Sequence, residues 1–166
     1  MLGHSLGEYA ALNTAGVLSD VDTIFLVGMR GQLLEQKCKC NTHAMLVVDG
    51  PIDRIAAALQ DSEYEIACIN SPMETVLAGP SKRMPELQEM LKMAGMRSTL
   101  LKVPYAFHSS QVDAILSDFK TQAQGVVFSD ANIPIIRPFD CTVSTTSTIF
   151  DADYLAYHSR EPVNML

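Results

Sequence analysis

The chain has 166 residues, enough for one ordinary domain, and its apolar fraction of 48% is typical of a packed globular protein. Its formal net charge of −7, without a long basic cluster, argues against nucleic acid or an anionic membrane surface as a partner. No apolar run approaches the ~20 residues of a membrane span, and no signal peptide is recognisable, so we expect a cytoplasmic protein.

The first forty residues are predicted to form two helices. Residues 6–15 contain good helix formers, and Gly16 follows them as a stop signal. Ser19 is predicted to cap a second helix, because Asp22 follows it three residues on. An apolar stripe continues this second helix to about Lys37.

The middle of the chain alternates between strand and helix patterns. Strands are predicted at residues 44–48, 65–69, 74–78 and 98–103. Helices are predicted at residues 52–59 and 81–94. Ser81 is a candidate cap for the second of these helices, and Gly95 ends it. The order is β-α-β-β-α-β, the split-βαβ or ferredoxin-like arrangement. It forms a compact unit that lies between two flanking segments.

The last third is predicted to be mainly helical. Residues 110–124 and 152–159 are expected to form helices, and residues 133–136 a short strand at a sheet edge because of Pro134. The Ser- and Thr-rich residues 142–149 are predicted to form a loop. We expect no strand or cap after the last helix.

A G-x-S-x-G pattern lies at the start of the chain, in Gly3-His4-Ser5-Leu6-Gly7. In a nucleophile elbow, the serine lies on a sharp, strained turn, and the glycines on either side let neighbouring backbone pass closely. Such a turn exposes the hydroxyl and places the N–H of Leu6 at a helix N-terminus, where it can bind an oxyanion. The alternative is a glycine-capped turn with a surface serine.

A serine nucleophile needs a base, and His108 is the candidate. It lies between a predicted strand and a predicted helix, a junction that places side chains at the edge of a sheet. His43 and His158 are interpreted as structural. His4 is adjacent to Ser5 in the sequence, and we expect it to point elsewhere.

No acid is clearly placed to orient His108. Asp113 follows five residues on and is predicted to be helical, so it points away. A backbone carbonyl that accepts from Nδ1 would do the same work and would make a Ser–His dyad rather than a triad.

Arg30 lies in an apolar stretch of the second predicted helix, between Gly28 and Gly31. A charge among apolar neighbours is costly unless it is paired, and the glycines leave room for a ligand. A planar guanidinium suits bidentate binding of a carboxylate. The alternative is a salt bridge to Glu35 or Glu8.

The cysteines and histidines do not indicate a metal site. Cys38 and Cys40 form a C-x-C pair rather than the C-x-x-C spacing of zinc and redox sites. Cys68 lies in an apolar run and is typical of a small core residue. No two histidines have the H-x-x-x-H spacing, so we expect no metal, no disulfide and no bound cofactor.

Four ordered stretches of the sequence resemble the malonyl-CoA:acyl carrier protein acyltransferase domain of polyketide synthases. They are GHSLGEYAAL, VGMRGQLLE, VPYAFHSSQVD and YLAYHSREPVN. The sequence is most similar to fungal iterative, non-reducing synthases, over the whole chain. The resemblance implies an α/β fold, with an α/β-hydrolase-like lobe at residues 1–43 and 104–166 and a ferredoxin-like lobe inserted at residues 44–103.

The resemblance also implies roles for single residues. Ser5 matches the acyl-accepting serine, His108 the histidine of the dyad, and Arg30 the arginine that holds the free carboxylate of the extender unit. Leu6 matches the residue whose N–H contributes to the oxyanion hole. Phe107 resembles pockets of the malonyl type, since a bulky ring crowds an α-methyl group.

His4 is counted with Arg30, Leu6 and Phe107 among the predicted substrate-binding residues. Malonyl-CoA is the implied substrate. The implied partners are an acyl carrier protein domain, with its phosphopantetheine arm, and a neighbouring ketosynthase domain.

The sequence departs from the family pattern at both ends. The segment before the elbow is absent, with a glutamine that supplies the other oxyanion donor, and so is the C-terminal end with the carbonyl partner of the histidine. These departures predict a fragment of a larger enzyme that is idle on its own. The alternatives are a non-catalytic truncated product, and a serine hydrolase or thioesterase with the same elbow.

Overall fold

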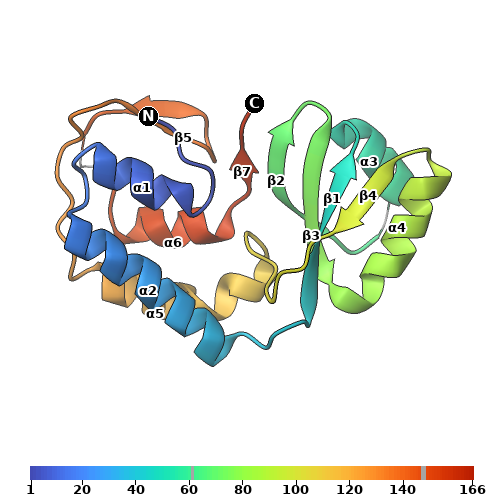
Figure 1. Cartoon of the computed structure of the whole chain (residues 1–166), viewed down its shortest axis with the longest axis horizontal. Helices are drawn as coiled ribbons and strands as arrows, with labels where there is room; N and C mark the ends of the chain where they lie inside the picture. Colours follow the sequence, from blue (N-terminus) through green and yellow to red (C-terminus); the bar gives the residue numbers. More distant parts are fainter. Residues whose placement is uncertain (61, 147–148) are drawn as a thin grey trace.

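The computed structural model describes residues 1–60, 62–146 and 149–166. Figure 1 shows two halves side by side, one mainly helical and the other a sheet with two helices on its outer face. Two segments of extended chain connect the halves, one after α2 and one before α5. The C-terminal strand β7 lies between the two halves.

Four helices pack around one core in the helical half. They are α1 (Gly7–Thr14), α2 (Asp20–Lys37), α5 (Asp113–Ala123) and α6 (Ala152–Arg160), with the 3-10 turn η2 (Ser110–Val112) leading into α5. Leu12, Leu26 and Phe119 are fully buried between them. The Ser19 hydroxyl accepts a hydrogen bond from the N–H of Asp22, which confirms the predicted cap.

The other half contains the β-α-β-β-α-β unit that the sequence predicts. Its elements are β1 (His43–Asp49), α3 (Ile52–Leu59), β2 (Glu65–Ser71), β3 (Glu74–Pro80), α4 (Met84–Met93) and β4 (Arg97–Leu100). The four strands are antiparallel in the order β4-β1-β3-β2. The last strand is shorter than predicted and ends at Leu100.

The central strands β1 and β3 of this sheet pack on both faces. Because side chains alternate along a strand, Leu46 and Val48 of β1 pack with α3 and α4 in one core, while Met45 packs in another. The second core includes Val76 of β3 and Ala106 of the segment before His108. Helices therefore cover one face of the sheet, and the His108 segment covers the other.

The predicted cap at Ser81 is wrong. Ser81 lies in the 3-10 turn η1 (Ser81–Arg83), and α4 begins at Met84 without a side-chain cap. The Ser81 hydroxyl donates to the carbonyl of Asn41 instead, so it is not free to cap the helix.

Two strands lie where the sequence predicted none. β6 (Thr142–Ser144) falls in the predicted loop and pairs antiparallel with β5 (Ile135–Arg137), while residues 147–148 of that loop lie outside the described residues. β7 (Val163–Asn164) follows the last helix and pairs parallel with β2. Extended chain after Pro162 lies against the open edge of β2, where Val163 is buried. None of the helices in the described parts of the chain has the length and hydropathy to cross a membrane.

Candidate active site

The G-x-S-x-G pattern forms a tight turn at the start of α1. Ser5 has a positive φ of 52°, a strained conformation for a residue with a side chain. Gly3 lies so close to the next turn of the chain that an added Cβ would be 2.3 Å from the carbonyl oxygen of Gly7. Leu6 is the N-cap of α1. This is the backbone that the nucleophile elbow requires.

Ser5 and His108 are brought together across 103 residues of sequence. The Ser5 Oγ lies 2.7 Å from the His108 Nε2. On the other side of the ring, the His108 Nδ1 lies 2.8 Å from the carbonyl oxygen of Glu161. Since a carbonyl can only accept, Nδ1 carries the proton, and Nε2 of the neutral ring accepts from the serine hydroxyl.

The Glu161 carbonyl corrects one sequence-based prediction. We expected the carbonyl partner of the histidine to be missing with the C-terminal end, but the chain supplies one. Helix α6 ends at Arg160, and Glu161 follows in an extended conformation with its N–H bonded to the carbonyl of Tyr157. The predicted Ser–His arrangement with a backbone acceptor therefore has all three of its parts.

His108 is held as a neutral base. Burial lowers its pKa to about 3, and the charges of His158 and Arg30 act in the same direction, against a smaller opposite effect of the Glu161 carbonyl. The side chain is 1% exposed. An imidazole in this state is free to take a proton from Ser5 throughout the neutral pH range.

Arg30 is buried with unsatisfied donors. It is 4% exposed, and its Nε and Nη2 have no hydrogen-bond partner. Its guanidinium carbon lies 5.8 Å from the centre of the Phe107 ring. Within the described residues Arg30 makes no ion pair, so the alternative of a bridge to Glu35 or Glu8 is wrong, and Glu8 contacts His158 instead.

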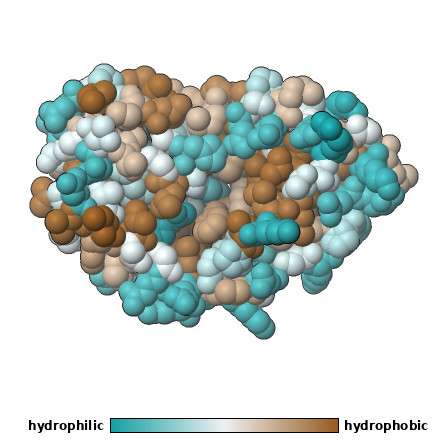
Figure 2. Space-filling view, in the orientation of Figure 1, coloured by the Kyte–Doolittle hydropathy of each residue, from teal (hydrophilic) through white to brown (hydrophobic). Residues whose placement is uncertain are grey.

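Two mainly apolar cavities meet at Phe107. The first, of about 330 Å³, is lined by Leu6, Val27, Arg30, Gly31, Leu34, Pro104, Tyr105 and Phe107. The second, of about 250 Å³, is lined by His4, Ser5, Met45, Val47, Cys68, Asn70, Val76, Leu101, Val103, Phe107 and His108. In Figure 2, hydrophobic side chains gather over the strands of the sheet toward the middle of the molecule. An acyl group on Ser5 would therefore meet apolar walls.

Of the other histidines considered from the sequence, His4 lies at the serine cavity and His43 does not. His4 lines the second cavity, and its Nε2 lies 2.8 Å from the Asn70 Oδ1. His43 contacts Thr42 at the start of β1, away from the elbow. Burial raises the pKa of Cys68 to about 11, so its thiol is not a competing nucleophile beside Ser5. No group of three His, Cys, Asp or Glu in the described part of the chain is arranged to hold a metal.

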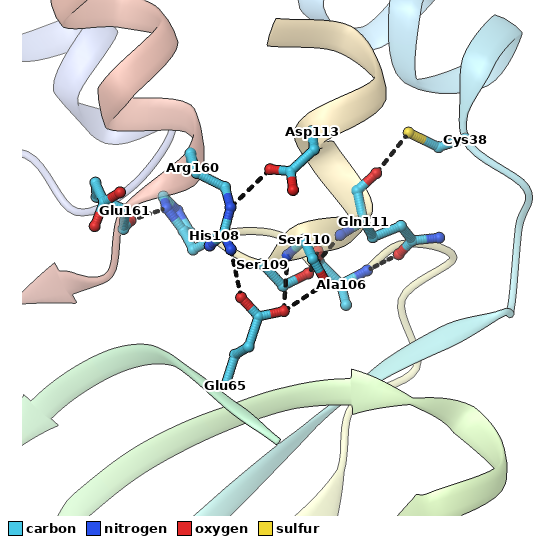
Figure 3. A network of polar contacts seen from close by, with 10 residues as sticks. All are labelled: Cys38, Glu65, Ala106, His108, Ser109, Ser110, Gln111, Asp113, Arg160 and Glu161. Carbon is cyan, nitrogen blue, oxygen red and sulfur yellow. Dashed lines mark hydrogen bonds and ion pairs between the residues drawn. The ribbon is translucent and has the colours of Figure 1, made fainter. Parts of the chain in front are cut away.

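A polar network that the sequence did not predict holds the His108 segment in place (Figure 3). Glu65, at the start of β2, accepts hydrogen bonds from the N–H of Ser110 at 2.8 Å and from its hydroxyl at 2.6 Å. Arg160, at the end of α6, donates to Glu65 at 2.6 Å and to Asp113 at 2.7 Å. Asp113 thus points away from His108, as predicted. The network links the sheet, α5 and α6 around the base.

The sequence matches the family described as "Acyl transferase domain" over residues 1–165. It is 60% identical over all 166 residues to a non-reducing polyketide synthase, fsr1, of Gibberella fujikuroi, of which the chain covers 7%. The chain thus spans under a tenth of the length of the curated relatives it matches.

Solved structures are similar over almost the whole chain. The acyltransferase domain from the second module of the salinomycin polyketide synthase is 33% identical with a TM-score of 0.87, covering 98% of this chain and 38% of that one. A malonyl-transacylase solved with its type II acyl-carrier protein, PlMCAT:AntF, is 28% identical with a TM-score of 0.89, covering 99% and 55%. These are α/β acyltransferase folds, as the sequence predicted.

Replacing Gly3 by Ala should destabilise the elbow. The new Cβ would overlap backbone of Gly7, which cannot rotate away, so we expect a loss of about 1–3 kcal/mol in the free energy of unfolding. Gly28→Ala is the matched control: a Cβ there meets nothing within 4 Å in the middle of α2, and should stabilise by about 0.5–1 kcal/mol. Urea unfolding of both variants checks this; equal effects would contradict the close approach at Gly3.

Glu65→Gln should remove a pH-dependent contribution to the free energy of unfolding. Burial alone would raise the pKa of Glu65, but hydrogen bonds from Ser110 and the Arg160 charge outweigh it and lower that pKa. A carboxyl whose pKa is lower in the folded chain than in the unfolded chain stabilises the fold at pH values above the unfolded-state pKa. This contribution is lost as the pH falls through the folded-state pKa. The difference in unfolding free energy between wild type and Glu65→Gln should therefore shrink between pH 7 and pH 3. A constant difference would show that the charge is not involved.

Proposed function

Because this chain belongs to the acyl transferase domain family, as found in polyketide synthases and homologous to malonyl transacylases, we propose that it loads malonyl groups onto a carrier. The donor would be malonyl-CoA, and the acceptor the phosphopantetheine thiol of an acyl carrier protein. The single observation that carries this proposal is the 2.7 Å contact between the Ser5 Oγ and the Nε2 of a neutral, buried His108.

The charge of Arg30 supports malonyl as the acyl group. A buried guanidinium with two unpaired nitrogens lacks an anion, and the free carboxylate of a malonyl group would supply one in bidentate geometry. Phe107 lies between Arg30 and the serine cavity and narrows the space beside the acyl chain. This arrangement favours an extender unit without an α-methyl group.

The first half of the reaction forms an ester on Ser5. His108 Nε2 takes the hydroxyl proton while the Ser5 Oγ attacks the thioester carbon of malonyl-CoA. The N–H of Leu6, at the positive end of α1, would donate to the oxyanion that forms. When the carbon–sulfur bond breaks, the CoA sulfur takes the proton from His108 and leaves as free thiol.

The second half transfers the malonyl group to the carrier. The phosphopantetheine thiol gives its proton to His108, and its sulfur attacks the ester carbon. The bond to the Ser5 Oγ breaks, and the serine oxygen takes the proton back from His108. The apolar walls of the second cavity favour thiol over water as the acceptor, because water gains few hydrogen bonds there. A malonyl-transacylase solved with its acyl-carrier protein has the same fold, which supports this choice of partner.

Incubation with malonyl-CoA should label Ser5. We expect a mass increase equal to one malonyl group on the peptide that contains Ser5, released by mild base, as an oxygen ester is. Ser5→Ala should take up no label, while Ser117→Ala, at an exposed position of α5, should still take it up. Peptide mass spectrometry checks the site. A wild-type chain that melts cooperatively but stays unlabelled would refute the proposed reaction.

Arg30→Ala should lose selectivity rather than all activity. Loss of the buried cation should slow malonyl loading by about 100-fold or more, in line with truncation of one partner of a buried charge pair. Acetyl loading, which needs no cation, should change by less than about threefold. Arg97→Ala is the control, because its side chain is 91% exposed and lines neither cavity. Equal losses with both acyl groups would make Arg30 structural.

A further inference from the structure

A buried acid next to the elbow has no part in the reaction so far described. Glu8 follows Ser5 by three residues, on the first turn of α1, and its side chain is 1% exposed. A carboxylate out of water costs several kcal/mol unless a partner offsets the loss of hydration. Both of its partners come from α6: the Tyr154 hydroxyl donates to Oε1, and the His158 Nε2 lies 3.2 Å from Oε2.

His158 links this acid to the base. It is 4% exposed, and its ring lies edge-on to His108 with 5.9 Å between the ring centres. Tyr9 and Tyr154 enclose the ring on other sides, at 5.7 Å and 6.4 Å. The contact with Glu8 has the distance of an ion pair without the angle of a hydrogen bond. His158 thus contacts both the Glu8 carboxylate and the ring of His108.

We propose that Glu8 and His158 form a buried carboxylate–imidazolium pair, and that His158 is a positioning residue that packs against the ring edge of His108 and opposes its protonation. This inference rests on the proposed role of His108 as the base. The His158 ring packs edge-on against His108, and the Glu8 anion lies on α1, with the N–H of Glu8 bonded to the carbonyl of Ser5. The pair as a whole is neutral, so it can be buried, and at His108 the imidazolium of His158 offsets the field of the Glu8 anion.

Other groups close to His108 also act on its pKa. Arg30 of α2 and His4 of the elbow also lower the pKa of His108, and the Glu161 carbonyl after α6 raises it. The effect of His158 follows that of burial and comes before that of Arg30. The β2 side chain in the cavity, Cys68, stays a neutral thiol because burial raises its pKa to about 11.

The size of the effect follows from the ring separation. A unit charge about 6 Å away, at an effective dielectric constant of about 20, changes a pKa by about two units. Replacing His158 by Gln removes the cation and leaves the Glu8 anion without its charged partner. The pKa of His108 should then rise from about 3 to about 5.

The test is a pH titration of the histidine rings in the full 166-residue chain. Nitrogen-15 NMR of the four labelled histidines, with His108 identified by His108→Gln, follows its protonation directly. In the wild type His108 should stay neutral from pH 9 to pH 5. In His158→Gln about half of it should be protonated at pH 5. The double variant Glu8→Gln, His158→Gln, which has neither charge, should titrate within about half a unit of the wild type.

Each outcome decides the proposal. A rise in His158→Gln that the double variant reverses supports it. An equal rise in both variants would mean that His108 has become more exposed, and no rise in either would mean that the unpaired Glu8 anion has no effect on His108; both results overturn it. If His158→Gln does not fold, His158→Phe, which keeps a buried ring without a charge, takes its place. Because the titration needs no acyl transfer, it reads the coupling even if Ser5 is never acylated.

Discussion

The hydrogen bond between the His108 Nδ1 and the Glu161 carbonyl is the contact on which the site depends. It fixes the tautomer, and only that tautomer leaves Nε2 free to accept from Ser5. The carbonyl is in place because α6 ends at Arg160 and β7 then pairs with β2. The chain end, the sheet and the elbow are therefore all needed to define the protonation state of one ring.

The burial of charge is the second constraint. Arg30, Glu8 and His158 are each at most 4% exposed in a mainly apolar interior. Glu8 and His158 lie within ion-pair distance of each other, although Glu8 Oε2 and both His158 ring nitrogens lack a hydrogen bond, whereas Arg30 makes no ion pair among the described residues. The fold pairs the charges of Glu8 and His158 with each other and leaves the Arg30 cation without an anion. It therefore favours the binding of an anion beside Arg30. The same low dielectric that makes the open cation costly makes its interaction with a bound carboxylate strong.

The sequence predicts the residues whose type carries the chemistry and misses the contacts that depend on tertiary packing. Ser5 lies in a five-residue motif, and Arg30 stands out among apolar neighbours, so both can be found locally. The partner of His108 could not, because a backbone carbonyl has no residue type to recognise. Glu8 and His158 are 150 residues apart, and Glu65 and Arg160 are 95 residues apart. Strand β7 was missed for the same reason, since two residues form a strand only beside an open edge.

The inserted sheet serves the site through its strand register. On β1, Leu46 and Val48 pack under the helices α3 and α4, while Met45 and Val47 line the cavity beside Ser5. A slip of one residue would exchange these sets, so the register that stabilises the insert also shapes the acyl cavity. The two roles nevertheless fall on alternate residues. A substitution on the cavity face of β1 therefore changes the space for the acyl group while the core under the helices keeps its packing.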